Sequence, residues 1–237
     1  MRTPKIDPKT ATRLAATEYD RFLQLLRSLG PRDWEKPTAC PGWDVRAMAS
    51  HLLGMAKMSA SIREGLRQNR IAARRGGVMI DALTALQVEE HAHLGPREII
   101  EQYAEITPKA VKGRRRTPRF LPVPGKQRVN GRDETWSFGF LNDVIMTRDP
   151  WMHRVDITRA TGAEHVLTKE HDGLLIDDVV KEWAERHGKP FTLRLTGPAG
   201  GEWGNGGPEI ELDAIDFCNA VSGRGPAEGL LSTEVPF

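Results

Sequence analysis

A ten-residue stretch, RDPWMHRVDI at residues 148–157, contains two carboxylates, a histidine and two arginines. Asp149 lies four residues before His153, and Asp156 lies three residues after it. Residues at these spacings share one face of an α-helix. A carboxylate and an imidazole one turn apart can reach a common point beside the helix, which is how helices present metal ligands. An isolated pair of this kind is more often a surface ion pair, so a further ligand is needed.

His51 is the candidate for that further ligand. It lies in AMASHLLGM, among apolar residues, where a lone histidine is more commonly a hydrogen-bonded core residue. If its helix faces residues 148–157, however, His51, Asp149 and His153 form a three-ligand site with open positions, which is typical of catalytic zinc. Asp156 would then support a ligating imidazole or serve as a structural anchor.

Other polar residues have a weaker case. Cys40 comes just before a predicted helix N-terminus, where a thiolate is favoured, but a small buried residue in a pinned loop is the commoner situation. His91 and His93 are two residues apart on a predicted helix, so they cannot chelate one ion together and are expected at the surface. The arginines at 74–75 and 114–116 could hold an anion, although such runs are mostly solvated.

The elements that must position these residues are predominantly helical. Apolar periodicity and flanking Gly and Pro residues predict helices over 9–29, 45–68, 81–94, 96–112 and 137–161. Pro150 is expected to kink the last of these or to lengthen its local geometry. The arginine-, glycine- and proline-rich segment 112–134 is predicted to be a long loop, and such long loops usually have a function or are disordered.

The pattern changes after Gly162. It predicts a helix over 168–187, strands in FTLRLTG and EIEL, a short helix in DAIDFCNAVSGR and a last strand in the tail STEVPF. The glycine-rich GGEWGNGG between the two strands is interpreted as a hairpin turn, since no helix follows it. We therefore predict a mainly α protein, with a four-helix bundle over residues 1–162 followed by a small α/β domain over residues 163–237.

Composition limits the class of protein. The 237 residues are 39% hydrophobic and 28% charged, which is typical of a soluble globular chain. No apolar run approaches the ~20 residues of a membrane span, and no signal peptide is recognisable, so a cytoplasmic protein without a membrane partner is expected. Two cysteines cannot form a disulfide framework. Nucleic acid is the least expected partner, because the arginines lie in loops without interleaved aromatic residues.

Two segments together resemble a known family. WEKPTACPGWDVRAMASHL at 34–52 and RDPWMHRVDITRATG at 148–162 are similar to two motifs of the mycothiol-dependent maleylpyruvate isomerases, whose bundle belongs to the DinB-like superfamily. The C-terminal DAIDFCNAVSGRGPAEGLLSTEVPF more weakly resembles the sterol-carrier-protein-like α/β domain that follows the bundle in that family. The resemblance covers nearly the whole chain.

The resemblance implies roles for individual residues. It assigns the metal ligands to His51, Asp149 and His153, and it implies that Arg224 of the C-terminal domain contributes to catalysis. Arg224 and Arg154 are candidates to bind a substrate carboxylate or the polar groups of a thiol. Zinc is the expected metal, while nickel, iron and manganese also suit two imidazoles and a carboxylate. The chain departs from the isomerase type at Asp149, where that type has glutamate.

The activity that the resemblance implies is thiol chemistry. A low-molecular-weight thiol, expected to be mycothiol, would be activated on the metal and would attack a small electrophilic substrate, giving transfer or isomerisation. Two other classes stay open: a metal- or ligand-binding protein without turnover, and a regulatory module that uses the arginine-rich loops. A homodimer is compatible with the sequence, which does not specify the oligomeric state.

Overall fold

The computed structural model describes all 237 residues and divides into two compact units. The bundle unit comprises Pro8–Pro118 and Asp149–His165, and the mixed unit comprises Met1–Asp7, Arg119–Arg148 and Val166–Phe237. The units are therefore discontinuous along the chain, whereas the sequence analysis predicted two contiguous segments divided at residue 162. None of the helices is both long enough and apolar enough to cross a membrane.

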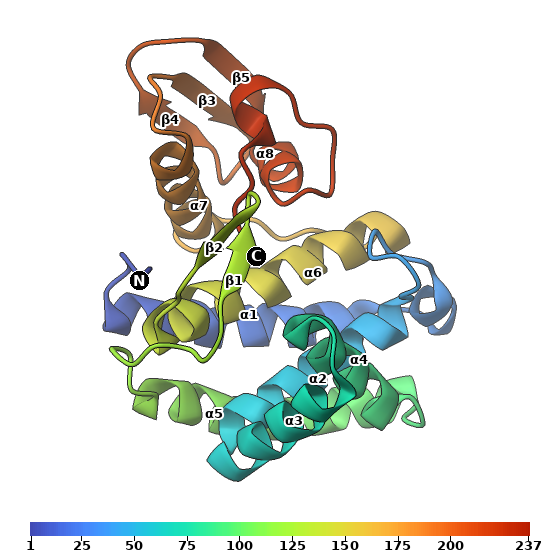
Figure 1. Cartoon of the computed structure of the whole chain (residues 1–237). Coiled ribbons are helices and arrows are strands. Elements are labelled where there is room, and N and C mark those ends of the chain that lie inside the picture. The colour runs from blue at the N-terminus through green and yellow to red at the C-terminus, as the bar shows by residue number, and fades with distance from the viewer. The chain divides into compact units, whose positions relative to one another are not determined.

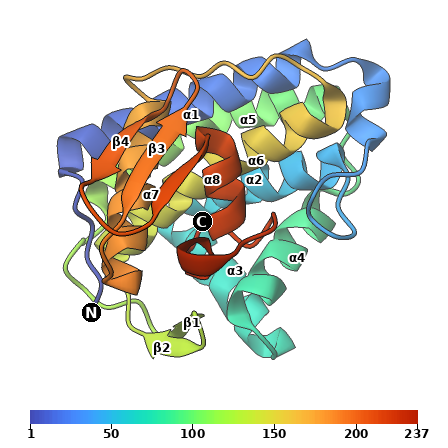
Figure 2. The same cartoon turned by 90° about the horizontal axis from the view of Figure 1, so that it is seen from above.

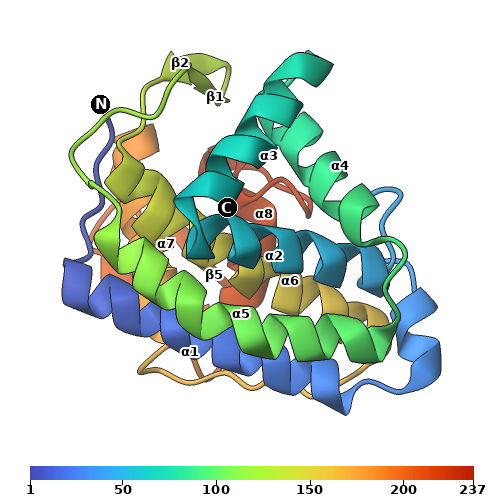
Figure 3. The same ribbon diagram turned by 90° about the horizontal axis from the view of Figure 1, so that it is seen from below.

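Four helices form the framework of the bundle unit: α1 (Pro8–Ser28), α2 (Val45–Ala60), α5 (Pro96–Arg116) and the part of α6 (Met146–Thr161) that begins at Asp149. Helix α5 packs against both α1 and α2, and α1 and α5 run side by side (Figure 3). Leu14, Phe22 and Leu26 recur at helical spacing along α1 and are fully buried. This apolar stripe follows the predicted periodicity, so the predicted first helix is confirmed.

A second helix pair, α3 (Ile62–Arg75) and α4 (Met79–His91), completes the bundle unit by packing on α2. The single helix predicted over 45–68 is wrong, because the chain leaves helical geometry at Ser61. The Ser61 side chain accepts a hydrogen bond from the backbone N–H of Glu64 at 3.3 Å, which caps a new helix. The Ser-x-x-Glu spacing is a known helix-start pattern that apolar periodicity alone does not detect.

Helix α6 is preceded by a π-helical turn at Phe140–Ile145. Pro150 lies in the second turn of α6 and has no N–H for the carbonyl of Met146, the first residue of the regular helix. The π-helical turn widens the helix upstream of Pro150, and the kink or lengthened geometry expected at Pro150 itself stays a prediction.

The C-terminal part of the mixed unit is the predicted small α/β fold (Figures 1 and 2). Its elements are α7 (Asp172–His187), β3 (Thr192–Thr196), β4 (Gly201–Gly204), β5 (Glu209–Asp213) and α8 (Ala214–Val221). The sheet order is β4-β3-β5, with β4 antiparallel and β5 parallel to β3. The glycine-rich segment interpreted as a turn thus contains an edge strand. The predicted last strand is also wrong, since the tail contains only a 3₁₀ turn at Gly229–Ser232.

The predicted loop 112–134 is more ordered than expected. Helix α5 continues to Arg116, and a hairpin of β1 (Gln127–Val129) and β2 (Arg132–Glu134) follows. The Asn130 side chain at its turn exchanges hydrogen bonds with the backbone of Glu234, and Arg186 of α7 donates to Glu134 at 2.9 Å. These contacts explain why the hairpin groups with the C-terminal elements rather than with the bundle unit.

Candidate metal centre

Three side chains of the bundle unit converge where α2 faces α6. The Nε2 atom of His51 lies 3.3 Å from Oδ2 of Asp149, and the Nε2 atom of His153 lies 3.4 Å from Oδ1 of the same carboxylate. One donor atom of each residue lies within 4.8 Å of the other two. The two imidazoles are buried, while the Asp149 side chain remains 19% exposed. The structure thus brings together the three residues that the sequence singled out as a ligand set.

The arrangement suits a divalent metal ion. Tetrahedral zinc with Zn–N and Zn–O bonds of ~2.1 Å places neighbouring ligand atoms about 3.4 Å apart, close to the two distances above. Each imidazole also has an acceptor for its other nitrogen: Nδ1 of His51 is 2.7 Å from Oε1 of Gln87, and Nδ1 of His153 is 3.1 Å from Oδ2 of Asp156. An imidazole that donates its Nδ1 proton to this acceptor leaves its Nε2 lone pair for a metal.

Protons compete with a metal for the same positions. Burial alone disfavours the charged form of Asp149, but the charges and hydrogen bonds of His153 and His51 outweigh it and hold the pKa of Asp149 well below its usual range. Burial likewise opposes charging of His153, yet the negative charge of Asp149 raises the pKa of His153 well above its ordinary value. The site therefore favours a cation next to the carboxylate, whether that cation is an imidazolium or a metal ion.

A chain of hydrogen-bonded side-chain amides begins at Nδ1 of His51. Nε2 of Gln87, on α4, donates to Oε1 of Gln68, on α3, at 2.9 Å, and Nε2 of Gln68 donates to Oε1 of Glu64 at 2.9 Å. Both glutamines are fully buried. With His51 donating to Gln87, every bond of the chain points the same way and ends on a carboxylate. We expect this alignment to fix the tautomer and orientation of His51.

Sequence reasoning missed Gln87 and Gln68. A usable pattern was present for the first: Leu83, Gln87 and His91 recur every fourth residue and are all buried in α4. Gly54 of α2 makes the contact feasible, because a Cβ atom there would lie 2.6 Å from Cβ of Gln87. The expectation that His91 lies at the surface is wrong, since it is 5% exposed and Lys57 donates a hydrogen bond to it; His93 is exposed as expected.

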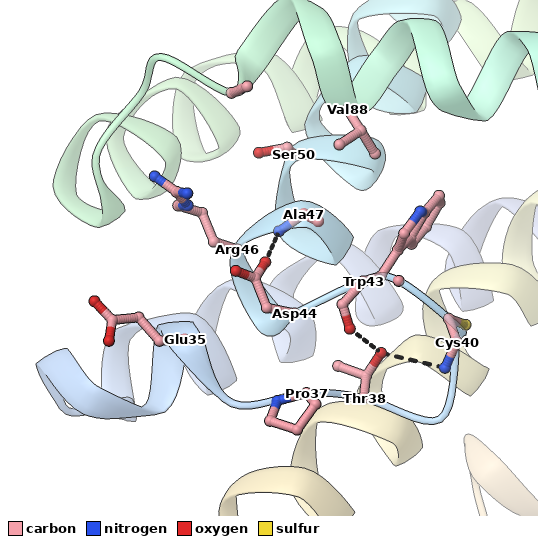
Figure 4. Close-up of a pocket in the computed structure, with 12 residues that line it drawn as sticks. Glu35, Pro37, Thr38, Cys40, Trp43, Asp44, Arg46, Ala47, Ser50 and Val88 are labelled. Carbon is pink, nitrogen blue, oxygen red and sulfur yellow. Dashed lines mark hydrogen bonds between the residues drawn. The ribbon is translucent and has the colours of Figure 1, made fainter.

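Cys40 belongs to the surroundings of this cluster. Its Sγ atom lies 3.9 Å from Oδ2 of Asp156. The backbone N–H of Cys40 donates to Oγ1 of Thr38, which in turn donates to the carbonyl of Trp43, so the loop is pinned (Figure 4). The cysteine is only half-buried rather than buried as expected.

A cavity of about 360 Å³ borders the same loop. Its lining includes Cys40, Trp43, Arg46 and Ser50 (Figure 4). The Trp43 ring lies 5.2 Å from the His51 ring and 6.2 Å from the His153 ring, measured between centroids. The buried hydroxyl of Ser50 has no hydrogen-bond partner within the protein. A cavity of this size accommodates a small molecule, and a polar ligand group could satisfy Ser50.

The two candidate arginines have different surroundings. Arg154 is buried and its guanidinium binds both carboxylate oxygens of Glu18, at 2.9 and 3.3 Å, which ties α6 to α1. This ion pair gives Arg154 a structural role, and its role in binding a substrate or thiol stays a prediction. Arg224 follows α8 in the mixed unit, where its backbone N–H bonds to the carbonyl of Asn219. Its catalytic role stays a prediction.

Comparison with known proteins agrees with these observations. No curated protein matches the chain significantly. The fold is similar to a crystal structure of the mycothiol-dependent maleylpyruvate isomerase, with a TM-score of 0.58 and 16% identity over 100% of this chain and 98% of that one. A mutant of the same enzyme gives a TM-score of 0.58 and 15% identity, over 95% of this chain and 93% of that one. Residues 15–158 match the family described as "Mycothiol maleylpyruvate isomerase N-terminal domain", and the chain therefore belongs to that family.

Proposed function

We propose that this protein is a metal-dependent enzyme that activates a low-molecular-weight thiol, mycothiol. The activated thiol either is transferred to a small electrophilic substrate or catalyses the isomerisation of that substrate. The observation that carries the proposal is the convergence of His51, Asp149 and His153, with each imidazole held by an acceptor at Nδ1. The family supports the choice of thiol.

The three residues supply an incomplete coordination shell. Two neutral imidazoles and one carboxylate leave room for a fourth ligand, as in catalytic rather than structural zinc sites. A divalent ion bound there would lower the pKa of a coordinated thiol and so provide a thiolate near neutral pH. The partial exposure of Asp149 is consistent with access from solvent.

Other residues of the chain hold the two imidazole rings in place and provide space for a substrate. With a metal on their Nε2 atoms, His51 and His153 would donate their Nδ1 protons to Gln87 and Asp156, which would keep both rings fixed when a ligand binds. Trp43 flanks the two rings, and the cavity beside it, with the unpartnered Ser50 hydroxyl, offers space for a small polar molecule. The substrate class that fits this cavity is therefore small and polar, and its electrophilic character is required by the proposed thiol chemistry.

The metal is tested by elemental analysis of protein purified without chelators. We expect about one divalent ion per chain, and a clear loss of metal in His51→Ala, Asp149→Ala and His153→Ala. His93→Ala is the matched control, because His93 is exposed and outside the cluster, and it should retain the metal. Full metal content in folded His51→Ala would contradict the three-ligand site.

The thiol is tested separately with cobalt in place of the native metal. Binding of mycothiol should add a thiolate-to-cobalt charge-transfer band, which should titrate well below the free-thiol pKa of ~8.5. The band must persist in Cys40→Ser, so that the added thiol and not the protein supplies the sulfur. A cobalt protein that responds to no thiol would instead indicate a metal- or ligand-binding protein without thiol chemistry.

A further inference from the structure

His153 lies between two groups of metal-binding atoms, of which the proposed thiol site uses only one. Its Nε2 atom faces Asp149 and His51, whereas its Nδ1 atom faces Asp156 and Cys40. Donor atoms of Cys40, His153 and Asp156 lie within 4.8 Å of one another, as do those of the first cluster. We propose that Cys40, His153 and Asp156 form a second metal position, which takes a thiophilic divalent ion as an alternative to the first.

The separations between the donor atoms suit such an ion. Tetrahedral zinc with Zn–S of ~2.3 Å and Zn–O or Zn–N of ~2.1 Å places the sulfur about 3.6 Å and the nitrogen about 3.4 Å from the oxygen. The structure has 3.9 Å between Sγ of Cys40 and Oδ2 of Asp156, and 3.1 Å between that oxygen and Nδ1 of His153. Small side-chain adjustments would bring all three atoms into a common coordination shell.

The second set differs from the first in softness and charge. A thiolate, a carboxylate and a neutral imidazole fully balance a divalent ion, whereas the first set leaves one net positive charge. Thiolate ligands also select soft ions over the harder ions that oxygen ligands prefer. Cadmium should therefore favour the position with Cys40, which the pinned Thr38–Trp43 loop holds in place and the adjoining cavity makes accessible.

The two positions exclude one another because a neutral imidazole has one lone pair. When Nε2 binds an ion in the first cluster, the Nδ1 proton is donated to Asp156 at 3.1 Å. When Nδ1 binds an ion in the second, the Nε2 proton can be donated to Asp149 at 3.4 Å. A carboxylate on each side of the ring thus satisfies either tautomer, and a thiophilic ion would displace the metal of the first cluster.

Cadmium titration of full-length variants tests this position independently of the proposed function. Asp149→Ala removes a ligand of the first cluster only, so it should still develop the ultraviolet thiolate-to-cadmium band, as should the wild type. Cys40→Ser, made in either background, should lack the band. Cys218→Ser is the matched control, since Cys218 is buried in the mixed unit, and it should retain the band. A band that survives Cys40→Ser, or no band in any protein, overturns the proposal.

Alkylation of the native protein gives a second measurement that needs no cysteine variant. Iodoacetamide should modify the half-exposed Cys40, with buried Cys218 as an internal reference, and cadmium should protect Cys40 in the wild type and in Asp149→Ala. The protection should be lost in Asp156→Ala. Equal alkylation of Cys40 with and without cadmium would show that the cysteine binds no ion. Failure of the proposed thiol site would leave both of these results unchanged.

Discussion

Asp149 uses its two carboxylate oxygens for two different imidazoles, Oδ2 for His51 and Oδ1 for His153. Aspartate is one methylene shorter than the glutamate of the isomerase type, so its carboxylate stays closer to the α6 backbone. The distances to both histidines nevertheless match those of a metal-ligand set. At the scale of single residues, aspartate in place of glutamate therefore changes the reach of the carboxylate without removing either of its oxygen atoms.

Asp149→Glu should consequently retain about one divalent ion per chain, whereas Asp149→Ala should lose it. The longer side chain can reach the same point with an adjusted rotamer, because the partly exposed position leaves space for one methylene. Metal content and chelator competition measure the outcome. Loss of metal in both variants would mean that the position tolerates only aspartate.

Support for His51 depends on how helices α2, α3 and α4 approach one another. Gly54 allows α4 close enough for Gln87 to reach the imidazole, and Gln68 of α3 then holds the amide of Gln87. We expect this contact between helices to fix the tautomer of His51, a proposed ligand on another helix.

Gln87→Met should lower metal affinity by about 10–100-fold, the usual effect of removing a partner of a ligating imidazole. The substitution preserves side-chain volume but removes the acceptor at 2.7 Å from Nδ1 of His51. Gln102→Met is the control, because Gln102 bonds to Lys57 and has no part in the chain to His51. Dissociation constants from competition with a fluorescent chelator give the comparison. Equal affinities in the two variants would exclude a role for Gln87 in tuning His51.

The stability of the packing between α3 and α4 should depend on pH because Glu64 titrates. Hydrogen bonds from Arg67 lower the pKa of Glu64 from 4.5 to about 2, against the opposing effect of burial, and Arg67 also pairs with Glu90 of α4 at 2.6 Å. Because the pKa is lower in the folded state, Glu64 stabilises the fold above pH 4.5, and this contribution disappears as the pH falls towards 2.

The expected size of this effect is about 1 kcal/mol, since both partners of the ion pair are partly exposed and solvent screens it. Denaturant unfolding of the wild type and Glu64→Gln should differ by this amount near neutral pH and converge in acid. Glu105→Gln is the control, because Glu105 pairs only with Lys109 at the surface of α5. A difference between wild type and Glu64→Gln that does not change with pH would contradict the titration of Glu64.

At the scale of the whole molecule, the two units have separate buried ion pairs. In the bundle unit Arg154 binds Glu18, and in the mixed unit Arg148 binds Asp178 at 2.6 Å and Glu182 at 2.7 Å. Arg148 is 1% exposed. Removing its charge would leave the buried carboxylate of Asp178 without its ion-pair partner, while Glu182 would keep its ion pair with Arg186.

Arg148→Met should therefore destabilise the mixed unit by about 3–5 kcal/mol, the usual cost of breaking a buried ion pair by deleting one partner. Hydrogen exchange of the backbone amides of α7 should report the unfolding of this unit. Arg128→Met is the matched control, because Arg128 is largely exposed in β1 and should cost little. A small and equal effect of both substitutions would show that the Arg148 pairs contribute no net stability.

Local patterns determined much of this protein. The apolar periodicity of α1, the Gly95-Pro96 start of α5 and the spacing of Asp149 and His153 depend on neighbouring residues alone, so the sequence was sufficient to predict them. The same holds for the helical bundle followed by a small α/β fold. Errors arose where short-range chemistry competes with periodicity, as at the Ser61 cap, or where glycines conceal an edge strand, as in β4.

The tertiary structure alone decided which distant residues meet. Nothing in the local sequence relates Gln87 to His51 or Cys40 to Asp156, because those contacts depend on how closely α4 approaches α2 and on where the Thr38–Trp43 loop lies beside α6. The sequence identified His51, Asp149 and His153 as possible ligands, but their convergence needed packed helices. Hydrogen bonds and metal coordination act over about 2–3 Å. Such distances are determined by side-chain packing between elements, and residue spacing along the chain does not specify them.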